Sequence, residues 1–187
     1  MDWLLQLDGN ILLWIQEYVR NDFLTPTMKF ITSLGNGGWL WIALALILCI
    51  PKKTRWVGIA AVISLAIGAL ITNVALKNLV ARIRPYEVVD GLKLIIAKPH
   101  DFSFPSGHTC ASFAAAMVLF KMLPKKWGVP AVVLATLIGL SRLYVGVHYP
   151  TDVLGGFIIG CFAAWIAVKI VEWIQKKRDK GTVPVSQ

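Results

Sequence analysis

Three stretches of this chain bring together side chains that can bind phosphate and transfer it. One is Phe-Pro-Ser-Gly-His-Thr around His108, and another runs from Arg142 through His148 to Asp152. The third, residues 77–84, adds a lysine and two arginines. Imidazoles, a carboxylate, a hydroxyl and fixed cations are the groups that phosphoryl transfer requires. The sequence therefore predicts phosphate chemistry at a single site.

The two histidines are suited to different steps of that chemistry. His148 lies four residues before Asp152, whose carboxylate in the first turn of a helix can accept the imidazole N–H. The other ring nitrogen is then free to attack phosphorus, and His108 can protonate the leaving oxygen and later act as a base. We predict His148 as nucleophile, Asp152 as its orienting group and His108 as general acid. For either histidine alone, a structural hydrogen bond is the alternative.

Cations are predicted to hold the phosphate oxygens, since we expect neither a metal nor another cofactor. Lys77, Arg84 and Arg142 fill this role, because arginine makes bidentate contacts and a lysine stem can run along apolar surface. Arg84 is directed by the rigid Pro85 that follows it. We interpret Arg82 as an ordinary interfacial cation.

The start of the helix after Pro105 is a further predicted phosphate contact. Free N–H groups at a helix N-terminus bind anions, and Gly107 lets a ligand approach the backbone. Ser106 can add its hydroxyl to these N–H groups. The alternative is that Ser106 only caps the helix.

The composition predicts an integral membrane protein. The chain is 57% hydrophobic and 16% charged, with a mean hydropathy of +0.66, well above ordinary soluble usage. We predict an all-α, polytopic transmembrane helical bundle that forms one domain over residues 1–180, followed by a loose polar tail, 181–187. Segments of low charge, compared with the roughly 20 residues needed to cross a membrane, predict five spans: 38–50, 56–76, 109–123, 127–147 and 153–174.

Residues 2–20 mix apolar residues with acids and amides such as Asp8. We predict an amphipathic interfacial helix here, because each charge at mid-bilayer costs about 2.5–3.5 kcal/mol. A sixth span is the alternative. A short helix over 25–34, with Thr25 as its N-cap, should follow, and glycines at 35–38 should then break the chain.

Basic residues predict the orientation of the spans, since cytoplasmic loops are rich in lysine and arginine. Clusters at 52–55, 121–126 and 176–180 would share the cytoplasmic side with the C-terminus. Parity then places the reactive stretches together on the extracytoplasmic face. We attribute the net charge of +9 to topology and anionic lipid contact, and expect no nucleic-acid partner. Cys49, Cys110 and Cys161 are interpreted as small core residues.

The spacing of the reactive residues resembles a known family. Lys77 and Arg84-Pro85 enclose six residues, Pro105-Ser106-Gly107-His108 follows, and Arg142, His148 and Asp152 are separated by five and three residues. This pattern is similar to all three motifs of the type 2 phosphatidic acid phosphatase superfamily. The resemblance implies a metal-independent phosphatase with the residue roles given above, acting on membrane lipid phosphates. Five spans argue against its soluble acid phosphatase and vanadium haloperoxidase branches.

The substrate is less directly encoded. The predicted third span would be only about 22 Å long, against a hydrocarbon core of about 30 Å, so its N-terminal phosphate site should lie at lipid depth. Resemblance to small bacterial relatives favours hydrolysis of undecaprenyl diphosphate to undecaprenyl phosphate at the bacterial plasma membrane. The alternatives are a phosphatidylglycerophosphate or phosphatidic acid phosphatase and, in another class, a non-hydrolytic lipid-phosphate binder or transporter. Transfer to an acceptor other than water, chain-length preference and oligomeric state stay open.

Overall fold

The computed structural model describes residues 2–181, and these form a helical bundle without strands. The prediction of an all-α fold is therefore confirmed for this part of the chain. The longer helices are α1 (Asp2–Trp14), α2 (Leu24–Leu34), α3 (Trp39–Cys49), α4 (Arg55–Ala69), α7 (Gly107–Met122), α8 (Lys125–Tyr144) and α9 (Pro150–Gly181). Shorter segments are η1 (Ile15–Val19), η2 (Asn36–Gly38), η3 (Leu70–Leu76), α5 (Lys77–Val80) and α6 (Pro85–Val88).

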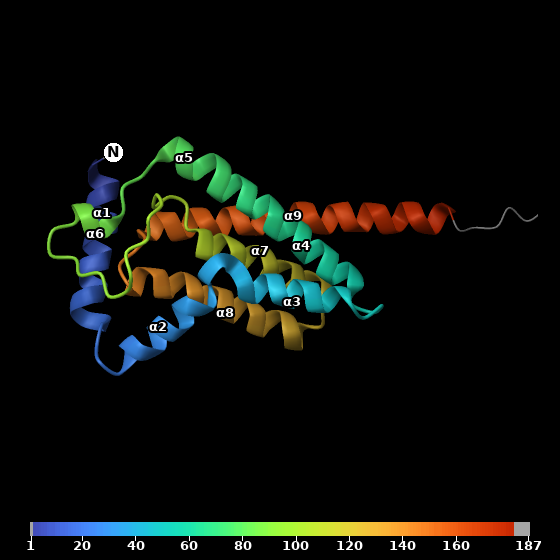
Figure 1. Ribbon diagram of the computed structural model, residues 1–187, viewed down its shortest axis with the longest axis horizontal. Helices are drawn as coiled ribbons and strands as arrows, with labels where there is room; N and C mark the ends of the chain where they lie inside the picture. The colour runs from blue at the N-terminus through green and yellow to red at the C-terminus, as the bar shows by residue number, and fades with distance from the viewer. Residues whose placement is uncertain (1, 182–187) are drawn as a thin grey trace, which may run out of the picture.

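Helix α7 lies in the middle of the bundle and packs against α4, α8 and α9 (Figure 1). The contact between α7 and α9 depends on glycine. A Cβ atom at Gly156 would lie 2.5 Å from the carbonyl oxygen of Ser106, and one at Gly160 would lie 2.6 Å from that of Cys110. These glycines therefore pack the bundle's own core, as small residues commonly do between membrane helices.

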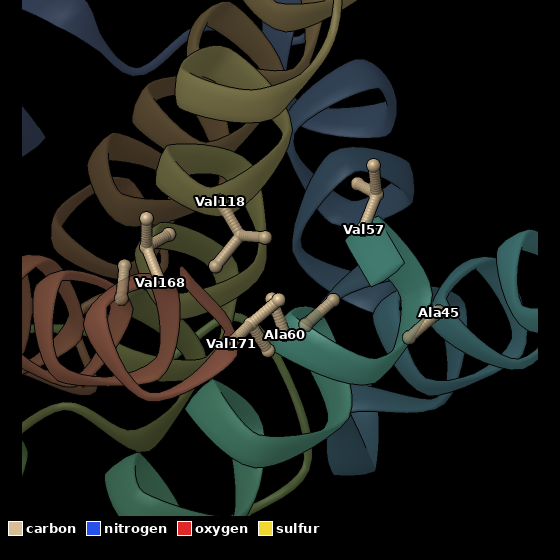
Figure 2. Packing of buried hydrophobic residues seen from close by; sticks show 8 residues of the cluster. Ala45, Val57, Ala60, Val118, Val168 and Val171 are labelled. Carbon is tan, nitrogen blue, oxygen red and sulfur yellow. The ribbon is translucent and has the colours of Figure 1, made fainter. Parts of the chain in front are cut away.

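Small apolar side chains also fill the core where α3, α4, α7 and α9 meet (Figure 2). Because alanine and valine side chains are small, the backbones of these four helices can approach one another closely. The labelled members of this cluster are Ala45, Val57, Ala60, Val118, Val168 and Val171.

The predicted count of five spans is not confirmed. Within residues 2–181, three segments are long and apolar enough to cross a membrane: Arg55–Val88, Lys125–Tyr144 and Pro150–Asp179. A fourth is possible if α2 and the segment Asn36–Cys49, bent by 44°, form one span. The predicted spans 38–50 and 109–123 correspond to α3 and α7, which have only 11 and 16 residues. Helix α7 is short, and the neighbouring helices α4, α8 and α9 pack around it.

The N-terminal helix is not among the segments long enough to span. Figure 1 shows α1 lying across the end of the bundle, the placement expected of an interfacial helix. The next helix, α2, begins one residue earlier than predicted, and Thr25 is not its cap. Instead, the side chain of Asn21 accepts hydrogen bonds from the backbone N–H of Phe23 at 3.1 Å and of Leu24 at 2.8 Å. An asparagine before the helix thus satisfies its first free N–H groups.

The predicted break after α2 is confirmed. Gly37 and Gly38 have positive φ angles of 59° and 68°, which favour glycine. This turn separates α2 from α3 and brings the end of α2 close to the start of α7. It therefore shapes one wall of the site described below.

The basic clusters gather toward one end of the bundle. The connection between α3 and α4, the connection between α7 and α8, and the last turns of α9 lie toward the end opposite α1 and α6 (Figure 1). Of the predicted tail, only Gly181 is described, as the last residue of α9, and residues 182–187 lie outside the described part. The orientation of the bundle in a membrane and the single-domain assignment stay predictions.

Candidate active site

The first motif, from Lys77 to Pro85, follows the end of α4. The helix widens into the π-helical segment η3 and ends with α5, where Ala81 has a left-handed φ of 47°. Arg84 then has an extended backbone, and Pro85 starts α6. Lys77 and Arg84 are only 8% and 4% exposed. Two buried cations so close in the chain require anionic or carbonyl partners.

The start of α7 provides the histidine and glycine of the second motif. Ser106 is the N-cap, and its hydroxyl accepts hydrogen bonds from the backbone N–H of Thr109 at 3.4 Å and from the Thr109 hydroxyl at 2.9 Å. The side chain of Ser106 is fully buried. The geometry therefore shows its capping function, while the predicted contact with phosphate stays untested.

A cavity of about 370 Å³ brings six of the eight predicted site residues together. Its wall also includes residues of α2, which the sequence did not connect with the site, and Arg142 donates a 2.6 Å hydrogen bond to Thr32 there. Ser106 and Asp152 are not among the described residues that line it. The predicted residues in the wall are Lys77, Arg84, Gly107, His108, Arg142 and His148.

His148 lies between α8 and α9, with one ring nitrogen facing a carboxylate and the other a cation. Its Nδ1 is 3.4 Å from Asp152 Oδ2, and its Nε2 is 3.5 Å from Arg84 Nη1. Burial lowers the pKa of His148 to about 4, although the hydrogen bond with Asp152 raises it. The imidazole is therefore neutral near pH 7. With the Nδ1 proton directed at Asp152, the lone pair of Nε2 is left free on the side of Arg84, which also lines the cavity.

His108 is held from the turn between α2 and α3. Its Nε2 is 3.0 Å from Asn36 Oδ1, which places a proton on that nitrogen. Gly35 lies against the same ring, since a Cβ atom at this position would be 2.7 Å from His108 Cδ2. Sequence reasoning missed Asn36 because it identified this turn only as a break in the chain.

Asp101 forms ion pairs with two of the cations that line the cavity. One carboxylate oxygen accepts from Lys77 Nζ, and the other lies 2.5 Å from Arg84 Nη2. Partial burial raises the pKa of the Asp101 carboxyl, but hydrogen bonds and charge from Lys77 and Arg84 outweigh this effect and lower it to about 2. Asp101 is therefore ionised at neutral pH and is the anion that pairs with both cations.

An opening of about 270 Å³ leads from the same residues into apolar surroundings. Lys77 and His108 line one part of it, while Ile42, Leu65 and Ala69 line another. Ile42 comes from α3, and Leu65 and Ala69 come from α4. A molecule with a polar group at the cavity could thus place an attached apolar chain between α3 and α4.

Comparison with known proteins identifies the family. A model described as the PAP2 superfamily matches residues 55–176, which include the cavity residues of α5, α7 and α8. The chain belongs to the PAP2 superfamily. This is the type 2 phosphatidic acid phosphatase superfamily that the three motifs resemble.

Two relatives of this PAP2 protein are named phosphatases. It is 35% identical to an undecaprenyl-diphosphatase from Sulfolobus acidocaldarius over 79% of this chain and 70% of that protein. It is 34% identical to phosphatidylglycerophosphatase B from Bacillus subtilis over 87% and 82% of the two chains. The protein is therefore an enzyme, a PAP2 phosphatase.

A solved structure shares this fold. The crystal structure described as the first transmembrane PAP2-type phosphatidylglycerolphosphate phosphatase, from Bacillus subtilis, superimposes with a TM-score of 0.74. The comparison covers 100% of this chain and 90% of that one at 28% identity. The likeness thus includes the N-terminal helices that lie outside the family match.

The interpretation of Arg82 as an ordinary interfacial cation is wrong. Its Nη1 lies 2.7 Å from Asp152 Oδ1 and its Nη2 lies 2.8 Å from Asp8 Oδ2, so it joins the third PAP2 motif to helix α1. Arg82 also lies two residues before Arg84, a spacing that projects both side chains to one side of an extended segment. That spacing is the sequence signal that could have identified it.

Proposed function

We propose that this PAP2 phosphatase hydrolyses a membrane lipid diphosphate, undecaprenyl diphosphate, to the monophosphate through a phosphohistidine on His148. The observation that carries the proposal is the position of His148 Nε2, 3.5 Å from Arg84 in a cavity that Lys77, His108 and Arg142 also line. A neutral imidazole next to several fixed cations suits attack on a phosphate group.

The proposed reaction has two steps. His148 Nε2 attacks the terminal phosphorus, the bond from phosphorus to the leaving oxygen breaks, and that oxygen takes a proton from the imidazolium form of His108, which becomes neutral. In the second step, His108 takes a proton from water, the water oxygen attacks phosphorus, and the N–P bond breaks to release inorganic phosphate. Asp152 stabilises the positive charge that develops on His148 in the first step.

Fixed cations replace a metal in this proposal. Lys77, Arg84 and Arg142 would neutralise the equatorial oxygens as charge spreads over them. Within residues 2–181, no group of three or more His, Cys, Asp or Glu side chains is arranged to hold a metal ion.

The lipid part of the substrate is supported by the apolar opening beside the site. An amphiphile could place its phosphate near Lys77 and its chain along Ile42, Leu65 and Ala69. Lys29 in the cavity wall offers a further positive charge for a second phosphate group. The alternative substrate is phosphatidylglycerophosphate, which the 34% identity to phosphatidylglycerophosphatase B over 87% of this chain favours.

A phosphate-release assay tests both parts of the proposal. The purified full chain, in detergent with a chelator present, is expected to release phosphate from undecaprenyl diphosphate with a higher kcat/KM than from phosphatidylglycerophosphate or phosphatidic acid. A preference for either glycerophospholipid would overturn the substrate assignment. Dependence on an added divalent metal would overturn the metal-independent reaction.

The substrate phosphate must also displace Asp101 from Lys77 and Arg84. The Asp101 side chain is 52% exposed, and such partly exposed ion pairs contribute about 0.2–1 kcal/mol each. Replacing Asp101 by asparagine is therefore expected to lower the inhibition constant for inorganic phosphate by about 2-fold to 30-fold. Competitive inhibition of the lipid phosphatase activity measures this constant.

Asp90 supplies a matched control, since it is an exposed acid in the same connection between α6 and α7. Asp90→Asn removes the same charge and should leave the inhibition constant unchanged. A constant that is unchanged or higher in Asp101→Asn would show that Asp101 does not compete with phosphate.

A further inference from the structure

We propose that Arg82 is a positioning residue, which holds Asp152 in place for His148 and is itself anchored by Asp8 of helix α1. This inference rests on the proposed role of His148 as the nucleophile. It is carried by a continuous set of contacts that runs from the N-terminal helix to the histidine–carboxylate pair.

Asp152 is fully buried, and both of its oxygens are occupied. Oδ2 accepts from the Ser103 hydroxyl at 2.5 Å and the Tyr149 backbone N–H at 2.9 Å, and lies 3.4 Å from His148 Nδ1. Oδ1 accepts from Arg82 Nη1 at 2.7 Å. Arg82 forms an ion pair with this carboxylate through Oδ1, the oxygen that His148 does not contact.

The guanidinium of Arg82 is fixed on three sides. Nη1 also donates to the Thr151 hydroxyl at 2.6 Å, and Nη2 donates to Asp8 Oδ2 at 2.8 Å. The central carbon of the group, Cζ, lies over the Tyr149 ring, 3.9 Å from its centre. Asp8 in turn accepts from the backbone N–H of Thr151 at 3.2 Å and from its hydroxyl. A guanidinium held in this way cannot rotate away from Asp152.

The main chain of Arg82 acts on the same carboxylate. Its carbonyl oxygen accepts a 2.8 Å hydrogen bond from the backbone N–H of Ser103, whose hydroxyl donates to Asp152. Ser103 is also fully buried. The side chain of Arg82 thus donates to Oδ1 of Asp152, and its backbone holds the serine that donates to Oδ2.

Electrostatics give this arrangement a measurable consequence. Asp8 and Asp152 are 2% and 0% exposed, and Arg82 lies between them. Removing one partner of a buried pair leaves an uncompensated charge. Without Arg82, the two carboxylates would attract a proton to His148 more strongly, and the nucleophile would become protonated at a higher pH.

Other charged or titratable groups also face the histidine–carboxylate pair, and all of them are retained in the Arg82 variants. They come from the segment before α6, from α8, α7 and α1, and from the connection before α9. These groups are Arg84, Arg142, His108, Asp8 and Tyr149.

The test compares the full-length Arg82→Ala enzyme with wild type across pH. In Arg82→Ala, kcat is expected to fall about 10²-fold because the nucleophile is no longer aligned. The pH below which kcat declines should rise by about 1 unit, because a cation has been removed near His148. The inhibition constant for inorganic phosphate should stay at its wild-type value, since Lys77 and Arg84 are untouched. The ionisation of the substrate is common to all variants and cancels in the comparison.

Asp8→Asn separates electrostatics from structural damage. It keeps the side-chain shape but removes a negative charge, so the decline of kcat should move to lower pH, opposite to Arg82→Ala. Arg82→Lys retains the charge but loses the planar fork, so it should keep the wild-type pH profile with part of kcat lost. Arg55→Ala, which removes an exposed arginine at the start of α4, should match wild type throughout.

Each outcome bears on the proposal. Arg82→Ala and Asp8→Asn profiles that do not move, or that move in the same direction, would reduce Arg82 to a structural role. If thermal unfolding in detergent shows that Arg82→Ala is not folded, the test uses the partial loss of kcat in Arg82→Lys and the shift to lower pH in Asp8→Asn instead, and the absence of both effects would overturn the inference. If wild type is active and the Arg82→Ala enzyme has the same kcat and the same pH profile, this inference alone is overturned. An inactive wild type, or an active His148→Ala variant, overturns the proposed function and this inference together.

Discussion

Replacing His148 by alanine is expected to reduce phosphate release by more than about 10³-fold, because the substitution removes the proposed nucleophile. His148 lines the cavity with its Nε2 atom 3.5 Å from Arg84, and no other imidazole among the described residues is paired with a buried carboxylate in this way. Rapid acid-free quenching with a substrate labelled on its terminal phosphate should trap labelled wild-type enzyme. The His148→Ala enzyme should carry no label.

The binding of phosphate separates loss of chemistry from loss of fold. Because Lys77, Arg84 and Arg142 remain, His148→Ala should still bind orthovanadate or inorganic phosphate, measured by protection against thermal unfolding. A variant that binds phosphate and also releases it at the wild-type rate would show that His148 is not the nucleophile.

Replacing His108 by asparagine is expected to slow phosphoenzyme formation from a lipid monophosphate by about 10²- to 10⁴-fold, the usual contribution of a general acid. The effect should be much smaller for undecaprenyl diphosphate. Its leaving group is a phosphate, with a second pKa of about 6, and it departs without a proton far more readily than an alkoxide. Single-turnover measurements with both substrates give the two rates directly.

The second step gives an independent signal in the same variant. His108→Asn lacks the base that activates water, so the phosphoenzyme formed from the diphosphate should accumulate. His100→Asn is the matched control, because His100 is exposed in the connection before α7 and belongs to neither proposed step. Equal slowing with both substrates, or a phosphoenzyme that turns over at the wild-type rate, would contradict the role of His108 as acid and base.

Much of the site could be predicted because the motifs place their residues within one or two turns. His148 and Asp152 are four residues apart across a helix start, and this local spacing is enough to pair them. Ser106 was likewise predicted as a possible cap from its position before a helix, and it accepts from Thr109. Contacts of this kind depend on backbone geometry that a short stretch of sequence determines.

The span count was harder to predict for a physical reason. Hydropathy measures the apolar character of a segment, but α3 and α7 are only 11 and 16 residues long. Whether such helices cross a membrane depends on how they bend and on which neighbours cover them. For α7 the neighbours are α4, α8 and α9, and for α3 the relevant feature is the 44° bend to α2.

By itself, the sequence determined that the protein is an apolar all-helical chain, that its reactive groups suit phosphate, and that His148 pairs with Asp152. Only the tertiary structure decided which distant residues support those groups. Asn36 and His108 are 72 residues apart in the chain, while Arg82 lies 74 from Asp8 and 70 from Asp152. Such contacts leave no local spacing pattern, because they form only when α1, the end of α5, α7 and α9 pack at the same end of the bundle.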